Sequence, residues 1–113
     1  MILDFDKIER KQMPEFKGGV GVFESDMYTD HLGKIMRGHL APGTSIGLHT
    51  HEGNSEIIYL IEGEGVVIYD GERERLLPGQ AHYCPMGHSH SLRNESDRPL
   101  TFIGIVPEHH IDK

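Results

Sequence analysis

The chain has 113 residues and a formal net charge of −7, from 11 Lys and Arg against 18 Asp and Glu. This length suits one domain, and the acidic balance argues against nucleic acid and anionic membrane as partners. The single cysteine, Cys84, excludes an internal disulfide and favours a reducing compartment, the cytoplasm. Charged residues within residues 1–6 argue against a signal peptide, and the apolar run at 57–61 is too short to span a bilayer.

Residues 1–17 show no clear pattern and are predicted to form an N-terminal arm, either a short helix or an extended segment. From Gly18 onward, short runs of β-forming residues alternate with turns rich in Gly and Pro. We expect strands at residues 19–24, 34–40, 46–51, 56–62, 65–70, 73–77, 81–84, 89–93 and 99–106. Asp70-Gly71, between two of these runs, predicts a hairpin turn. The spacing predicts an all-β, antiparallel sandwich or barrel over residues 18–113.

The 9 histidines are the unusual feature of the composition. His49 and His51 share one face of a predicted strand because alternate side chains point the same way. Glu56 begins the next strand, and His90 lies on a strand far downstream. Three imidazoles and one carboxylate would suit a divalent transition metal and leave coordination positions open. A His-x-His pair alone is more often two ordinary strand residues, and spacing alone does not bring Glu56 or His90 to it.

Two glycine-bounded motifs contain these four residues. The first, at 43–63, is formed by Gly43, His49, His51, Glu56 and Gly63; the second, at 79–94, by Gly79, Pro85, Gly87, His90 and Asn94. Through these ten positions the chain resembles a small single-domain cupin. The resemblance implies a single jelly-roll β-barrel with a metal inside its mouth, held by His49, His51, Glu56 and His90. It also implies a homodimer. The face formed by Ile57, Tyr59 and Ile61 would then be covered either by the flank of the second sheet or by the partner subunit.

The donor set favours Mn²⁺ or Fe²⁺, while Ni²⁺, Zn²⁺ and Cu²⁺ accept the same ligands. The resemblance implies a metal-dependent enzyme on a small polar organic substrate, of the dioxygenase, isomerase, lyase or decarboxylase type. In such an enzyme the metal is a Lewis acid or O₂ activator. The alternative is a non-catalytic module that binds or senses a sugar or organic acid; a stress or storage protein fits the complete ligand set least well. Fold and ligands alone do not choose among these functions.

Two features bear on the substrate. Oxalate-processing cupins carry a polar residue three positions before the first metal-binding histidine, where this chain has Ile46, which argues against oxalate. An apolar pocket near Ile46, Leu48, Ile58 and Leu60 would favour a partly apolar substrate. Lys or Arg side chains that reach the mouth would favour an acid.

The remaining candidates surround this predicted site. His82 and Cys84 share a strand face. We expect His82 to act in catalysis or to support a metal ligand; the alternative is a core histidine bonded to backbone. Cys84 is expected to be a small buried residue. His88 is a weaker pocket candidate, and Phe102 and its strand are expected to line or back the pocket. The other histidines are expected on an outer strand (His39) or in solvated loops and the tail (His31, His109 and His110). Asn94 is expected to bond turn backbone.

Overall fold

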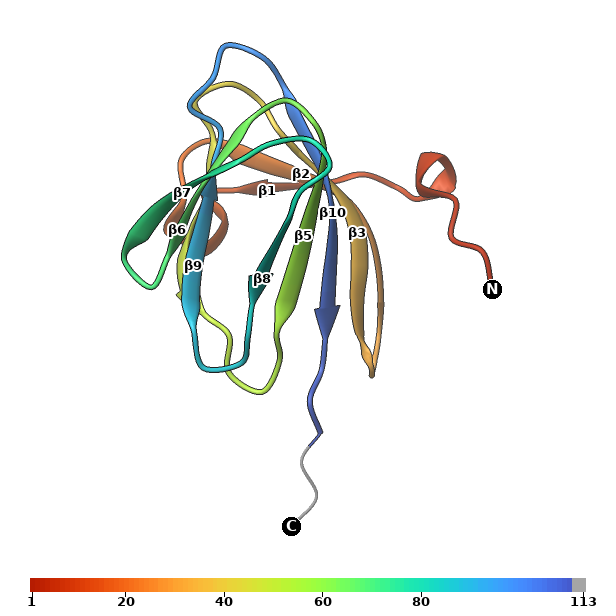
Figure 1. Cartoon of the computed structure of the whole chain (residues 1–113). Helices are drawn as coiled ribbons and strands as arrows, with labels where there is room; N and C mark the ends of the chain where they lie inside the picture. The colour runs from red at the N-terminus through yellow and green to blue at the C-terminus, as the bar shows by residue number, and fades with distance from the viewer. Residues whose placement is uncertain (111–113) are drawn as a thin grey trace.

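The computed structural model describes residues 1–110, which form two packed antiparallel sheets (Figure 1). The six-stranded sheet has the order β1-β2-β3-β10-β5-β8, and the four-stranded sheet has the order β4-β9-β6-β7. The strands of the larger sheet are β1 (Lys11–Pro14), β2 (Val22–Asp30), β3 (Gly33–Leu40), β10 (Leu100–Pro107), β5 (Glu56–Glu62) and β8 (Ala81–Cys84). Those of the smaller sheet are β4 (Ser45–Thr50), β9 (Ser89–Arg93), β6 (Gly65–Tyr69) and β7 (Glu72–Leu76).

Within residues 1–110, no strand of one sheet pairs with a strand of the other. The smaller sheet ends at β4 and β7, and the larger at β1 and β8, so the predicted closed barrel is corrected to a jelly-roll β-sandwich. The two short 3₁₀ helices, η1 (Phe5–Lys7) and η2 (Phe16–Gly18), complete the described elements. No helix in this part of the chain has the length and apolar character needed to cross a membrane.

The N-terminal segment differs from the prediction. Residues 1–17 contain η1 and also β1, which pairs antiparallel with β2, so part of the expected arm is an edge strand. β2 begins at Val22 and reaches Asp30, whereas the sequence predicted a strand at 19–24. The domain limits of 1–17 and 18–113 remain a prediction.

The predicted hairpin at Asp70-Gly71 is present between β6 and β7, where Tyr69 pairs with Glu72. Asp70 has φ 48° and Gly71 has φ 84°. Positive φ at both central residues is the geometry that two-residue hairpins favour, and glycine adopts it without steric cost. The turn therefore follows directly from the local sequence.

Apolar side chains from both sheets fill the space between them. Phe23 of β2 stacks on Phe102 of β10 with ring centroids 5.9 Å apart. On β5 the predicted alternation is confirmed: Ile58 and Leu60 are buried, while Tyr59 and Ile61 are each 46% exposed. The buried apolar cluster consists of Phe23, Met36, Leu40, Ile46, Ile58, Leu60, Val67, Leu76, Leu92, Leu100, Phe102 and Val106. This packing provides the main stabilisation and fixes the strands that carry the polar site.

Candidate metal centre

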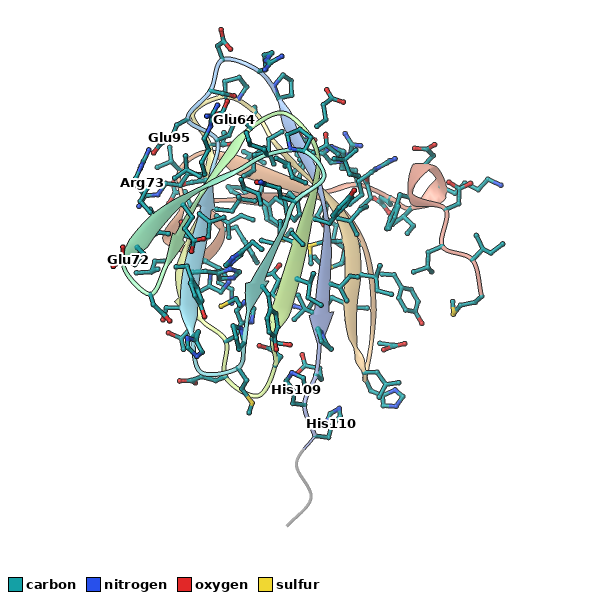
Figure 2. The ribbon with its side chains drawn as sticks, viewed as in Figure 1. Glu64, Glu72, Arg73, Glu95, His109 and His110 are labelled. Carbon is teal, nitrogen blue, oxygen red and sulfur yellow. The ribbon has the colours of Figure 1, made fainter. Side chains whose placement is uncertain are left out.

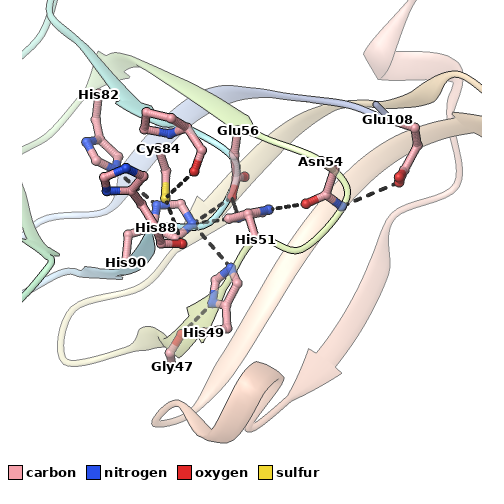
Figure 3. Close-up of polar contacts among 11 residues, drawn as sticks. Gly47, His49, His51, Asn54, Glu56, His82, Cys84, His88, His90 and Glu108 are labelled. Atoms are coloured by element: carbon pink, nitrogen blue, oxygen red, sulfur yellow. Dashed lines mark hydrogen bonds and ion pairs between the residues drawn. The ribbon is translucent and has the colours of Figure 1, made fainter. Parts of the chain in front are cut away.

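Four polar side chains converge between the two sheets. His49 on β4 is directly opposite His90 on β9, His51 follows the end of β4, and Glu56 begins β5. The Nε2 atom of His90 lies 2.9 Å from Nε2 of His51, 3.2 Å from Nε2 of His49 and 2.9 Å from Oε1 of Glu56. Oε1 of Glu56 is also 3.1 Å from Nε2 of His51. Figure 3 shows the three imidazoles turned toward one another beside the Glu56 carboxylate.

An irregularity in β4 directs His49 into this site. The pairing of β4 with β9 shifts register between Ile46 and His49. Both residues consequently face inward although their numbers differ by three, and Leu48 is 62% exposed. A bulge redirects side chains in this way. Of the four apolar residues considered for a pocket, Ile46 lines the cavity, Leu48 faces solvent, and Ile58 and Leu60 lie in the core.

Each of the three histidines uses its second ring nitrogen in a hydrogen bond. These bonds are His49 Nδ1 to the Gly47 carbonyl at 2.7 Å, His51 Nδ1 to Asn54 Oδ1 at 2.6 Å, and His90 Nδ1 to His82 Nε2 at 3.0 Å. A carbonyl oxygen only accepts, so His49 donates from Nδ1 and its neutral form has a lone pair on Nε2. His51 likewise donates from Nδ1 to the Asn54 oxygen; its Nε2 carries a proton when it donates to Glu56 and would offer a lone pair once a metal ion replaced that proton. This arrangement of ligand and supporting acceptor is typical of metal-binding histidines.

Burial and local charge set the protonation of the group. Burial raises the pKa of Glu56, but hydrogen bonds from His51 and His90 outweigh this effect and lower it to about 2. The hydrogen bond with Glu56 raises the pKa of His51, against burial and the positive charge of Lys17. Burial lowers the pKa of His49. Glu56 is thus an anion among imidazoles, which is a donor set that fits a divalent transition-metal ion.

His82 lies on β8 behind His90. Its side chain is buried, and burial lowers its pKa to about 4, so the imidazole is neutral. When Nε2 of His90 offers its lone pair to a metal, its Nδ1 carries the proton and donates to Nε2 of His82. Cys84 is fully buried, as predicted, and burial raises the pKa of its thiol to about 11. Cys84, His82 and His90 form a second compact donor group, in which Cys84 would have to lose its thiol proton to bind a metal.

The other predicted residues lie apart from this group. His88 contacts Asp70 at 2.5 Å and the Tyr69 hydroxyl at 3.2 Å, on the solvent side of the site. His39 on β3 contacts the buried Asp26 at 3.0 Å. Asn94 donates to the backbone of Leu40 and Arg98, as expected of a turn residue.

The remaining histidines lie at the chain ends and in a loop. His109 and His110 follow β10 at the C-terminal end of the described chain (Figure 2). His109 contacts the Ser55 hydroxyl at 2.9 Å, and His110 donates to the His31 carbonyl at 2.8 Å. These contacts fasten the chain end to neighbouring loops and do not add donors to the centre.

A cavity of about 310 Å³ opens beside the four residues. Three of them, His49, His51 and Glu56, line it, while Phe102 lies behind it in the core. Its apolar wall is formed by Phe16, Phe23, Met27, Met36, Ile46 and Val106. Two cationic residues, Lys17 and Lys34, also line it. Neither lysine carries a local sequence signal, and Lys17 lies in the N-terminal stretch that lacks a pattern.

Comparison with known proteins identifies the family. The family model described as "Cupin domain" matches residues 36–106, which include both motifs and all four converging residues. The chain belongs to the cupin family. This cupin is 30% identical over 112 residues to an oxalate-binding protein of Thermotoga maritima, with 94% of this chain and 93% of that protein covered.

Solved structures agree with this assignment. A predicted oxalate decarboxylase from Thermotoga maritima superposes with a TM-score of 0.90 at 29% identity, covering 96% of this cupin and 99% of that chain. A cupin-superfamily sugar phosphate isomerase from Silicibacter pomeroyi has a TM-score of 0.79 at 24% identity, covering 96% and 76%. The latter similarity concerns the fold alone.

Proposed function

We propose that this cupin binds one divalent transition-metal ion, Mn²⁺ or Fe²⁺, through His49, His51, Glu56 and His90. One observation carries the proposal: three imidazole Nε2 atoms and a carboxylate oxygen converge while each imidazole is held from behind at Nδ1. Since Nδ1 of His49 and His51 faces an acceptor, the lone pairs at Nε2 are directed into the centre. Ni²⁺, Zn²⁺ and Cu²⁺ would accept the same donors, so the choice of metal rests on geometry and supply.

We propose that the protein is an enzyme for a small polar organic substrate. A bound ion would supply Lewis acidity or activate O₂, and four protein ligands leave one or two positions for substrate or water. The apolar wall of the cavity would exclude water around the substrate carbon atoms, and His82 would hold the orientation of His90 as a positioning residue. The alternative is a non-catalytic binding module, which the name of the oxalate-binding relative favours.

The relative also bears on the choice of substrate. Its printed name concerns oxalate, whereas the apolar Ile46 in the cavity of this cupin argues against that ligand. The prediction against oxalate therefore stays open. Oxygen uptake and proton release by the Mn²⁺-, Fe²⁺- and Ni²⁺-loaded protein over a panel of organic acids and sugars separate enzyme from binding module. Ligand binding without turnover would favour the module.

The metal site is tested by His51→Ala and Glu56→Ala, with His31→Ala as the control because His31 is exposed and does not belong to the group of four donors. Metal per chain is measured by elemental analysis after dialysis against Mn²⁺. We expect about one ion in the control and strong loss in both site variants. Equal metal content in all three proteins would contradict the ligand assignment.

We also propose a homodimer formed through the outer face of the larger sheet. Apolar side chains from neighbouring strands are adjacent there, since Tyr59 pairs with Ile103, and Ile57 pairs with both Ile105 and Tyr83. Tyr83 is 56% and Ile105 38% exposed. A contiguous exposed apolar patch of this kind favours association. Location in the cytoplasm remains part of the proposal, supported by the free, buried Cys84.

A further inference from the structure

Cationic and anionic side chains balance in the cavity beside the candidate metal centre, although the protein as a whole is acidic. Lys17 and Lys34 line the cavity, and its only lining carboxylates among the described residues are Glu52 and Glu56. With a divalent ion in place, positive charge exceeds negative charge in the cavity, although the whole chain has a net charge of −7. A low-dielectric cleft with one sign of charge attracts ligands of the opposite sign. The cavity therefore favours an anion.

The backbone of Lys17 is held in a costly conformation. Its φ is 56° and its ψ is 28°, in the left-handed region, where a side chain other than that of glycine is sterically disfavoured. The segment packs closely against β4 because the strand has a glycine at the contact. A Cβ at Gly47 would be 2.0 Å from the Lys17 carbonyl oxygen. Gly19 is equally close to the β4 backbone, since its Cβ would be 2.1 Å from the Ser45 carbonyl oxygen. The lysine is thus seated firmly on the strand that carries His49.

The side chain of Lys17 lies beside Phe16, and both residues line the cavity. Its ammonium group lies 5.6 Å from the centre of the Phe16 ring. In the described chain no carboxylate forms an ion pair with Lys17. The ammonium group is therefore available to a ligand. Lys34 adds positive charge, but it also borders a shallow depression between β2 and β10 and so faces two surfaces.

We propose that Lys17 binds a second anionic group, carboxylate or phosphate, of a small acid whose first polar group binds at the metal centre. This inference rests on the proposed function. The short carbon chain between the two groups would lie against the apolar wall of Phe23, Met36 and Ile46. An ammonium-to-anion contact is a charge-assisted hydrogen bond, and such bonds are about twice as strong as neutral ones. Lys17 is thus the residue that distinguishes a dianionic from a monoanionic ligand.

The test uses Mn²⁺-loaded full-length protein and isothermal titration calorimetry. The probes are malonate, succinate and glycerol 3-phosphate as dianions, with acetate and glycerol as their singly charged and neutral counterparts. The variant is Lys17→Asn, because asparagine tolerates the left-handed conformation and keeps the segment in place. Lys11→Asn is the control, since Lys11 is exposed on β1 and does not line the cavity.

We expect the control variant to bind at least one dianion more tightly than it binds acetate. Lys17→Asn should weaken the binding of that dianion about tenfold. Its affinity for acetate, its metal content and its melting temperature should match those of the control. The dianion with the largest loss identifies the remote group as carboxylate or phosphate. Equal affinities of the two variants for every dianion, or no preference for dianions over acetate, would overturn the inference. Wild-type protein that holds no metal would instead overturn the proposed function, and the inference with it.

Discussion

The Nδ1 atom of His90 lies 3.0 Å from Nε2 of His82, so one buried histidine holds another in the tautomer that a metal ligand needs. The two residues come from different sheets, His90 from β9 and His82 from β8. Figure 3 shows His82 behind His90, on the side away from Glu56. The contact therefore couples the separation of the two sheets to the geometry of the centre.

Replacement of His82 tests this coupling. In His82→Ala, His90 loses its acceptor, and we expect metal affinity to fall about 10- to 100-fold, as is common when a supporting partner of a ligand is removed. The measurement is competition with a chelator. His88→Ala is the matched control, because His88 bonds Asp70 and does not contact His90. Unchanged affinity in His82→Ala would show that the His90 orientation is set by packing alone.

A second prediction concerns the glycine below the Lys17 segment. In Gly47→Ala the new methyl group would lie 2.0 Å from the Lys17 carbonyl oxygen and 2.7 Å from the Gly19 nitrogen. Both neighbours are backbone, so relief requires displacement of a whole segment, and we expect a loss of about 1–3 kcal/mol in the free energy of unfolding. Urea denaturation measures it. Gly43→Ala is the comparison, since Gly43 has φ 79° but a Cβ built there has no neighbouring atom within 4 Å. A larger loss of unfolding free energy in Gly43→Ala than in Gly47→Ala would contradict the steric explanation.

The acid stability of the fold depends on Asp26. This buried carboxylate of β2 contacts Arg10, Arg37 and His39 at 2.9–3.0 Å. Burial raises the pKa of Asp26, but the hydrogen bonds from Arg10, His39 and Arg37 outweigh burial and hold it well below its usual range. Because the pKa is lower in the folded state, the stabilisation is complete above about pH 4, the pKa of an unfolded Asp, and is lost as pH falls toward the folded pKa.

Asp26→Asn should therefore lower the free energy of unfolding by about 1–3 kcal/mol at pH 7 and by less at pH 3. Urea denaturation between pH 2.5 and pH 7 measures the difference. Asp30→Asn on the same strand is the control, because Asp30 is exposed. A constant difference between wild type and Asp26→Asn across this range would contradict the assigned role of the carboxylate.

The proposed dimer predicts a change of mass. Ile61→Glu places a charge on the exposed face of β5, where Ile61 is 46% exposed. We expect sedimentation equilibrium to give a dimer for wild type and a monomer of 12.8 kDa for the variant. Leu48→Glu, on the outside of the other sheet, serves as control and should remain a dimer. A monomeric wild type, or a dimer in Ile61→Glu, would contradict the proposed interface.

Local patterns explain why most of the strands were predictable. Between Leu40 and Leu100 each strand is bounded by Gly, Pro or Asn turns, and the alternation on β5 correctly assigns buried and exposed faces. The resemblance of the two motifs to those of cupins predicts the four metal-ligand candidates. Spacing alone could not bring His90 next to His49, because that contact requires the pairing of β4 with β9.

Three features depend on tertiary contacts and are not predicted from the sequence. β1 has the sequence Lys-Gln-Met-Pro, which carries no alternation, and it is a strand because β2 offers a free edge. The bulge before His49 exposes Leu48, and the signal for it was Gly47, since a glycine inside a strand often marks a bulge. No local sequence pattern predicts that Lys17 lines the cavity beside the centre.

The most direct test of the metal centre is anomalous diffraction from crystals soaked in Mn²⁺. The predicted result is one strong peak about 2.2 Å from Nε2 of His49, His51 and His90 and from a carboxylate oxygen of Glu56. A peak elsewhere, or none at a Mn²⁺ concentration that saturates binding in solution, would contradict the assignment of these four residues as the metal ligands.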